Sequence, residues 1–197
     1  MKIQNWFMAL TAVFSLSLST ALLAQTFNLD SQKSEIEWKG TKVGGSHEGT
    51  IQFESGSLVF KDGQLSSGEL VVDMNSIVNT DISDPEKQAD LVGHLKSDDF
   101  FAVSDHSTAK IVFTDISKKG DEKYEIKGDF TVRGITKPIT FTAELKQEGD
   151  MLEGESELSF DRAQHNVKYN SGTFFEKLGD KLIHDKIQLD IKIAAKK

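Results

Sequence analysis

KYEIKGDFTVRGITKPITFTAEL, residues 123–145, is the stretch that decides the fold. Residues of one face, apolar except for Gly128, alternate strictly with charged or polar residues from residue 124 to residue 133, and the alternation resumes from residue 139 to residue 145, beyond a turn-forming segment. A period of two over this length is typical of half-buried antiparallel strands. The stretch therefore predicts a β-hairpin with one apolar face, which the rest of the chain must cover.

The same alternation recurs on both sides of this hairpin. Residues 26–30 lead into the sheet, and further strands are predicted at residues 35–39, 49–54, 58–61, 65–75, 109–116, 151–161 and 186–194. Turns are predicted between them, at residues 43–46, 55–56, 61–64, 118–121 and 147–150. Asp62-Gly63 in one of these turns is a strong hairpin signal. About eight or nine strands with short turns predict an all-β chain, either a barrel or a sandwich.

Two segments break the alternation. In residues 75–106, Asp84 and Pro85 provide a capping residue and a first-turn proline, which are typical of a helix start. Residues 97–101 look like a second helix start, so this segment is predicted to be one long helical crossover between two strands. Residues 162–185 are predicted to be a second, irregular insertion.

The first 24 residues are predicted to be a secretory signal peptide. Lys2 precedes an apolar run with interspersed Ser and Thr, and Ala24 is a small residue suited to cleavage. A single-pass anchor is the alternative, but the run is short for a bilayer. The sequence therefore predicts export to the periplasm or the exterior, with one mature domain at residues 25–197.

Composition narrows the classes of function. Without Lys2 the formal net charge changes from −8 to −9, so the mature chain is expected to repel nucleic acid. The chain has no cysteine, which excludes a thiol nucleophile, disulfide bonds and attachment of a lipid through cysteine. Stability must therefore come from the sheet and its core.

No residue pattern predicts catalysis or a metal site. The five histidines are scattered, and no H-E-x-x-H motif, phosphate-binding loop or dinucleotide fingerprint is present. His94 with Asp98 and Asp99 could supply metal ligands, but a helix end with an acidic turn explains them better. Asp180, His184 and Asp185 likewise suit a solvated loop.

The aromatic residues indicate an apolar site instead. Thirteen phenylalanines are many for this length, and their rings suit either a solid core or a dry ligand pocket. The strand residues predicted to face such a pocket are Trp38, Phe53, Val72, Phe113, Phe130, Phe141 and Phe160. The pairs Phe100-Phe101 and Phe174-Phe175 lie in the two irregular segments and are predicted to form a lid over one end of a barrel.

Residues 128–140, GDFTVRGITKPIT, resemble the signature G-x-L/F-T-x-x-G-x-T-K/R-P-V/I-T of the YceI-like family, whose members are exported proteins that bind lipids or polyisoprenoids. Residues 93–101 resemble the family's H-L-x-S-x-D-F-F segment. Further similar segments lie at residues 49–53, 72–77, 161–162 and 179–191. The chain departs from the family at Lys33, where His is frequent, and at residues 163–167.

The resemblance implies an extended eight-stranded antiparallel lipocalin-like β-barrel with a helical insertion. Its ligand would be an isoprenoid of the quinone or polyprenyl type, or another amphiphilic lipid, held for transport, storage or sequestration. The family has no associated catalytic residues, so no enzyme, cofactor or metal is expected, nor stable membrane insertion. Members are often dimeric, so a homodimer is one expected assembly. The main alternative is a ligand-free barrel that serves in dimerisation or protein interaction, and an enzyme acting on a lipid is the third.

Overall fold

The computed structural model describes residues 24–197, so the predicted signal peptide, apart from Ala24, lies outside the described residues. The strands within this range are β1 (Gln25–Leu29), β2 (Glu35–Lys42), β3 (Gly45–Lys61), β4 (Gln64–Asn79), β5 (Thr108–Lys118), β6 (Lys123–Val132), β7 (Ile135–Glu148), β8 (Met151–Asp161) and β9 (Ile183–Lys196). The helices are α1 (Pro85–Lys96) and two short 3₁₀-helices, η1 (Arg162–His165) and η2 (Gly179–Lys181).

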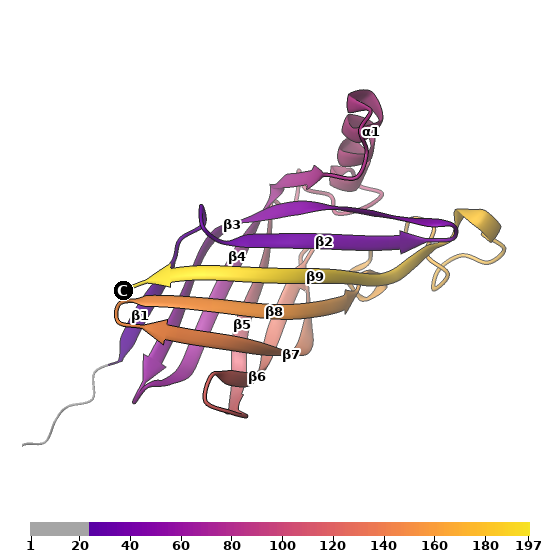
Figure 1. Cartoon of the computed structure of the whole chain (residues 1–197). Helices are drawn as coiled ribbons and strands as arrows, with labels where there is room; N and C mark the ends of the chain where they lie inside the picture. The colour runs from indigo at the N-terminus through magenta and orange to yellow at the C-terminus, as the bar shows by residue number, and fades with distance from the viewer. Residues whose placement is uncertain (1–23) are drawn as a thin grey trace, which may run out of the picture.

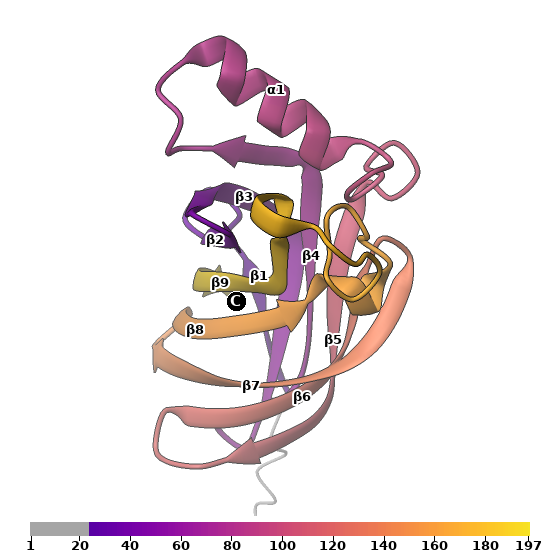
Figure 2. The same ribbon diagram turned by 90° about the vertical axis from the view of Figure 1, so that its right-hand side faces the viewer.

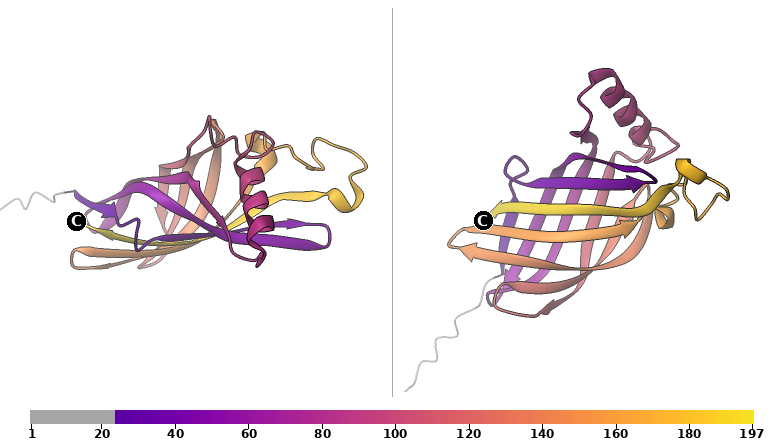
Figure 3. Two further views of the ribbon diagram at one scale, coloured as in Figure 1. Left: turned by 90° about the horizontal axis from the view of Figure 1, so that it is seen from above. Right: turned by 45° about the vertical axis from the view of Figure 1, so that its right-hand side comes forward.

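The strands form one antiparallel barrel that is elongated along its axis (Figures 1 and 3). Its order is β3-β2-β9-β8-β7-β6-β5-β4, and β4 pairs again with β3 to close an eight-stranded ring. β1 pairs with both β3 and the end of β9, so it occupies the same place in the ring as β2, further along the axis. The predicted fold class is therefore confirmed.

The two ends of the barrel are built differently. One end, called here the helical end, carries α1, the β2–β3 and β6–β7 turns and the connection from β8 to β9 (Figure 2). The other, called here the packed end, carries β1, the C-terminus and the β3–β4, β5–β6 and β7–β8 turns. Every connection longer than a few residues between β2 and β9 is thus gathered at the helical end.

The hairpin of residues 123–145 is confirmed as β6 and β7. These strands are joined by the two-residue turn Arg133-Gly134, in which φ is 50° and 70°. Positive φ at both positions gives the turn a twist that matches the right-handed twist of the strands. A Cβ atom on Gly134 would lie 2.8 Å from the His106 ring, so this position needs glycine for space as well as for its backbone angle.

The predicted turn at residues 55–56 is wrong, because β3 runs through it without a break. The pairing of β3 with β4 shifts between Phe53 and Ser55, so a local bulge absorbs the irregularity that the sequence suggested. Gly56 is explained by packing, since a Cβ atom there would lie 2.6 Å from Leu70 Cδ2.

The end of β4 also differs from the prediction, since the strand continues to Asn79 instead of ending at residue 75. The β3–β4 register jumps from Asp73 to Val78, which leaves residues 74–77 bulged between two paired parts of β4. This bulge hides the alternation in the sequence while keeping the strand in the barrel.

The helix begins where it was predicted, with the Asp84 carboxylate accepting hydrogen bonds from the backbone N–H groups of Glu86 and Lys87. The prediction of one long helical crossover is wrong. The helix ends at Lys96, the Ser97 hydroxyl donates to the His94 carbonyl, and turns follow until β5. No helix within residues 24–197 is long and apolar enough to cross a bilayer.

Burial of the inner side chains changes along the barrel axis. Towards the packed end, Phe27, Leu58 and Leu152 have 1% or less of their surface exposed. Along β9 towards the helical end, inner side chains such as Ile187 and Leu189 are only half-buried. A barrel packed along its whole length would not leave these apolar side chains accessible, so its interior is hollow at the helical end.

Candidate functional site

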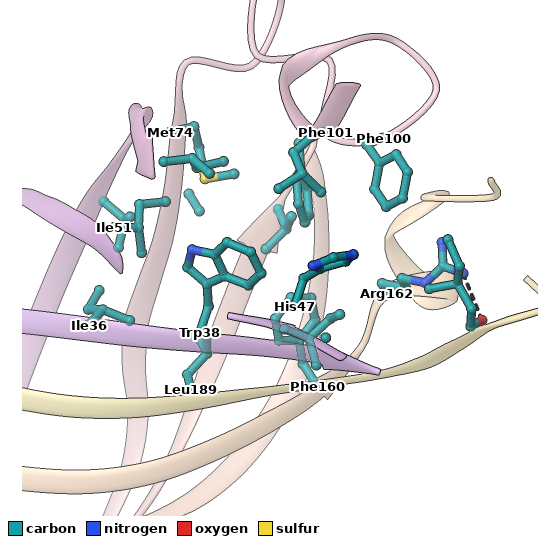
Figure 4. Close-up of a pocket in the computed structure, with 18 of the residues that line it drawn as sticks. Ile36, Trp38, His47, Ile51, Met74, Phe100, Phe101, Phe160, Arg162 and Leu189 are labelled. Carbon is teal, nitrogen blue, oxygen red and sulfur yellow. Dashed lines mark hydrogen bonds between the residues drawn. The ribbon is translucent and has the colours of Figure 1, made fainter. Parts of the chain in front are cut away.

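A cavity of about 160 Å³ lies inside the helical end of the barrel (Figure 4). Inner side chains of β2–β6, β8 and β9 form its wall, and α1 and the turn that follows it contribute Leu91, Leu95, Phe100 and Phe101. Almost all of these side chains are apolar. The cavity therefore offers space to an apolar group and few hydrogen-bond partners to a polar one.

Six of the residues predicted from the sequence line this cavity. They are Trp38, Val72, Phe100, Phe101, Phe130 and Phe160. Four of them lie on strands and share the inner face by simple alternation, which is why the sequence could identify them. Phe100 and Phe101 lie in the turn after α1, as the lid prediction required.

Trp38 is held in one orientation by the backbone around it. Its indole N–H lies 3.3 Å from the Thr50 carbonyl and 3.2 Å from the Val78 carbonyl. The close approach needs Gly49, because a Cβ atom there would lie 1.9 Å from the Val78 oxygen and 2.8 Å from the indole ring. Trp38 therefore presents only apolar ring surface to the cavity, since its single donor is used.

A second, smaller cavity of about 50 Å³ lies further along the barrel, and Phe113 and Phe141 line it. On several strands the boundary between the two cavities falls between consecutive inner residues, such as Phe160 and Leu158 on β8. At this boundary the Phe130 and Phe160 rings meet edge to face with centroids 5.2 Å apart. These two rings line the large cavity on the side that faces the packed end.

Three predicted site residues lie elsewhere. Phe53 is 5% exposed and belongs to the core, outside the lining of either cavity. Phe174 and Phe175 are 41% and 49% exposed, so the prediction that they cover the barrel end is corrected. Their backbone N–H groups bond to the Ser171 carbonyl in a turn, and neither residue lines the cavity.

Arg162 anchors the connection from β8 to β9 at the mouth of the cavity. Its side chain has no exposed surface. Nη1 donates to the Val167 carbonyl at 3.0 Å, Nη2 to the Ile183 carbonyl at 3.0 Å, and Nε to the His184 carbonyl at 3.3 Å. Nη2 also lies 3.2 Å from Asp185 Oδ1 in an ion pair. One buried guanidinium thus ties both ends of this connection together.

The surroundings of Arg162 balance the cost of burying its charge. Burial lowers the pKa of the Arg162 guanidinium, and the carboxylates of Asp185 and Asp161 offset part of this effect. Asp185 Oδ2 accepts hydrogen bonds from the hydroxyl groups of Ser171 and Thr173, each 2.8 Å away. The buried Oδ1 has no hydrogen-bond partner within residues 24–197 and is held only by its ion pair with Arg162. The cluster is therefore a structural anchor.

His165 forms a second buried polar anchor. Its ring is 2% exposed, packs edge to face on Phe130 and Phe160, and donates from Nδ1 to the Ile135 carbonyl at 2.9 Å. Burial lowers the pKa of His165, against the opposing effect of hydrogen bonds to the backbone carbonyls of Ile135 and Val132. Burial thus favours the neutral ring, which packs behind two aromatic residues of the cavity lining.

The contacts of Arg133 give a structural reason for an arginine in residues 128–140, the most specific stretch of the sequence. From the β6–β7 turn its Nη1 donates to the carbonyls of Phe100 at 2.8 Å and Asn166 at 2.9 Å, and its Nη2 donates to the Asp98 carbonyl at 2.8 Å. One side chain thus fixes both irregular connections, including the turn that carries two aromatic lining residues.

Sequence reasoning missed four polar residues at this end: His47, Arg133, Arg162 and His165. His47 could have been found, because it shares the inner face of β3 with Ile51 by alternation. The other three lie in or beside turns, where no periodicity indicates the direction of a side chain. Their roles depend on carbonyl groups that are distant in the sequence.

The residues considered as metal ligands do not come together. His94 Nε2 lies 3.7 Å from Asp99, His184 Nδ1 bonds to the Thr41 hydroxyl, and Asp185 is engaged by Arg162. Within residues 24–197 no group of three or more His, Cys, Asp or Glu side chains has an arrangement that could hold a metal ion.

Comparison with known proteins agrees with this architecture. The family model of the YceI-like domain matches residues 27–195 of this chain. The chain belongs to the YceI-like family. A UPF0312 protein of Pectobacterium atrosepticum is 30% identical over 176 residues, which cover 87% of this chain and 88% of that protein. A UPF0312 protein of Pseudomonas putida is 30% identical over 144 residues, 68% of this chain and 72% of the relative.

Solved structures of the YceI-like fold are also similar to this chain. BcnA of Burkholderia cenocepacia superposes with a TM-score of 0.69 at 20% identity, over 85% of this chain and 99% of BcnA. A polyisoprenoid binding domain from Saccharophagus degradans superposes with a TM-score of 0.63 at 16% identity, over 86% of this chain and 97% of that domain. At these identities the similarity concerns the fold.

Proposed function

We propose that this YceI-like protein is an exported binding protein that holds the apolar chain of an isoprenoid, or of another amphiphilic lipid, inside the helical end of its barrel. The observation that carries the proposal is the cavity of about 160 Å³, which apolar side chains from seven strands and α1 enclose. The half-buried inner residues of β9 support it, because they are the surface that a bound chain would cover. The description of the Saccharophagus degradans neighbour as polyisoprenoid binding agrees with this class of ligand.

Binding would be driven by burial of the chain. Each methylene group that leaves water contributes about 0.8 kcal/mol. A chain of roughly ten methylene groups would retain several kcal/mol after the costs of ordering. A chain too long for the first cavity would have to displace Phe130 and Phe160, because these rings separate it from the second cavity.

Export is part of the proposal and rests on the signal-like residues 1–24. Transport, storage and sequestration of the bound lipid all fit a binding protein of this kind. The alternative of a ligand-free barrel that acts in protein interaction predicts an interior that stays empty.

The test is organic extraction and native mass spectrometry of the protein purified from a host that makes isoprenoids. Phe101→Asp places a charge in the cavity lining, and Phe175→Asp is its matched control on an exposed phenylalanine. We expect the wild type and Phe175→Asp to carry lipid and Phe101→Asp to carry none, with equal melting curves by circular dichroism. A wild type that yields no lipid and takes up no added geranylgeraniol would contradict the proposal and favour the ligand-free alternative.

A further inference from the structure

Four polar or charged side chains reach the lining of the large cavity: Thr41, Lys42, His47 and Arg162. Arg162 donates three hydrogen bonds to backbone carbonyls and pairs with Asp185, and the Thr41 hydroxyl lies 2.8 Å from His184 Nδ1. Lys42 lies at the end of β2, next to the β2–β3 turn. His47 is different, because it lies on the inner face of β3 and only one of its two ring nitrogens has a partner within residues 24–197.

That partner is Asp81, which follows β4. Asp81 Oδ2 lies 2.9 Å from His47 Nδ1, while Oδ1 accepts a hydrogen bond from the Glu48 backbone N–H at 2.9 Å and another from the Asn79 side chain. Burial acts to raise the pKa of Asp81, but these hydrogen bonds and His47 together lower it. An ionised carboxylate can only accept, so His47 Nδ1 must be the donor.

This contact determines what the other nitrogen offers. When Nδ1 of a neutral imidazole carries the proton, Nε2 carries a lone pair and can only accept a hydrogen bond. Across the β2–β3 ladder His47 pairs with Gly40, which has no side chain, and a Cβ atom at Gly40 would meet nothing closer than Ile187 Cδ1 at 3.6 Å. Figure 4 shows the His47 ring among the cavity side chains, between Trp38 and Arg162 in that view.

We propose that His47 and Asp81 form a head-group site for an apolar chain that ends in a hydroxyl group, such as a long-chain alcohol or a phenol. The ligand O–H donates to His47 Nε2, and the chain runs from there past Trp38 towards Phe130 and Phe160. An ether or carbonyl oxygen at the same place has no proton to donate. Its lone pairs would face the lone pair of Nε2, and no hydrogen bond would form. This inference deepens the proposed function and rests on it, since it requires a chain in the cavity.

The test compares geranylgeraniol with its methyl ether, which has the same chain but no donor. Binding is measured by displacement of a fluorescent apolar probe from the wild type, His47→Leu, Asp81→Asn and, as a control on an exposed residue outside the cavity lining, Phe175→Leu. We expect the wild type and Phe175→Leu to prefer the alcohol by about tenfold, the effect of one hydrogen bond. His47→Leu should lose this preference because the alcohol binds more weakly.

Asp81→Asn provides a readout that a purely structural role of this pair would not produce. An amide oxygen can keep the contact with the Glu48 N–H, while the amide N–H₂ then faces His47 Nδ1 and donates to it. The ring proton moves to Nε2, which becomes a donor, so binding of the ether should strengthen relative to the wild type.

Other results would contradict the head-group site, the proposed function or the role of His47. Equal affinity of the wild type for alcohol and ether, or an alcohol preference that survives in His47→Leu, would overturn the head-group site and leave the lipid-binding proposal intact. Absence of binding for both probes would remove the proposed function as well. Tighter binding of geranylgeranyl phosphate than of the alcohol, lost in Lys42→Ala and kept in His47→Leu, would assign the head group to Lys42 and overturn the role of His47.

Discussion

At the packed end of the barrel Leu152 has no exposed surface, whereas at the helical end Leu189 remains half-buried beside a cavity. Both leucines face inward from adjacent strands, so the local sequence pattern treats them alike. The two ends are nevertheless stabilised differently. The packed end is held by burial of apolar side chains. The helical end is held by polar side chains that bind backbone carbonyls, chiefly the half-buried Arg133 and the buried Arg162 and His165.

The difference between the two ends shows how a barrel can keep one end hollow. Apolar packing cannot hold segments around a space that must stay open, because the contacts that it needs would fill that space. Hydrogen bonds from arginine and histidine are directional and fix the surrounding backbone without occupying the interior. The predictions that follow test this division, from the largest expected effect to the smallest.

Arg162→Ala should have the largest effect. It leaves the carbonyls of Val167 and Ile183 without their donors and the carboxylate of Asp185 without its counter-charge. We expect a loss of about 3–5 kcal/mol in the free energy of unfolding, measured in urea. A loss below about 1 kcal/mol would mean that the helical end does not depend on this anchor.

Leu152→Ala and Leu189→Ala form a matched pair on β8 and β9. The packed position should lose about 3 kcal/mol of stability and the cavity position about 1 kcal/mol, because truncation at Leu189 enlarges a space that already exists. Urea unfolding measures both, and only Leu189→Ala should alter binding of a lipid probe. Equal losses at the two positions would contradict the distinction between the ends.

Phe130→Leu should weaken the barrier between the two cavities. We expect a loss of about 1–1.5 kcal/mol in stability, because a leucine fills less of this buried position. Binding should shift by several fold in favour of geranylgeraniol over the shorter farnesol, measured by competition. An unchanged preference for chain length would show that the ligand does not extend past this ring.

Substitution of His165 should have the smallest effect on stability, and this effect should depend on pH. Because burial lowers its folded-state pKa below the ordinary value near 6.5, stability should be complete above that pH and fall as the pH drops towards the folded-state pKa. Comparison of the wild type with His165→Gln at pH 7.5 and pH 5 isolates this term, since other groups titrate in both proteins. We expect the wild type to lose stability relative to His165→Gln between pH 7.5 and pH 5. No difference between the two pH values would show that His165 titrates alike in the folded and unfolded states.

Much of the fold could be predicted from the sequence. Alternation located most of the strands, the Asp84-Pro85 pair located the start of α1, and residues 128–140 identified the family. The errors lie where two strands deviate from ideal pairing. The register shift between Phe53 and Ser55 and the bulge at residues 74–77 are irregularities that only a partner strand can hold in the sheet, so the sequence alone suggested breaks.

The sequence by itself determined which side chains face inward, because a period of two depends only on the local backbone. Only the tertiary structure decided which inward-facing residues meet across the barrel and which leave a cavity, since that depends on register and on the segments that close each end. It also assigned Phe174 and Phe175 to the surface and Arg162 to the interior, the reverse of what their polarity suggests. A buried charge is stable only where several chain segments bring their carbonyl groups together, and no single stretch of sequence contains that arrangement.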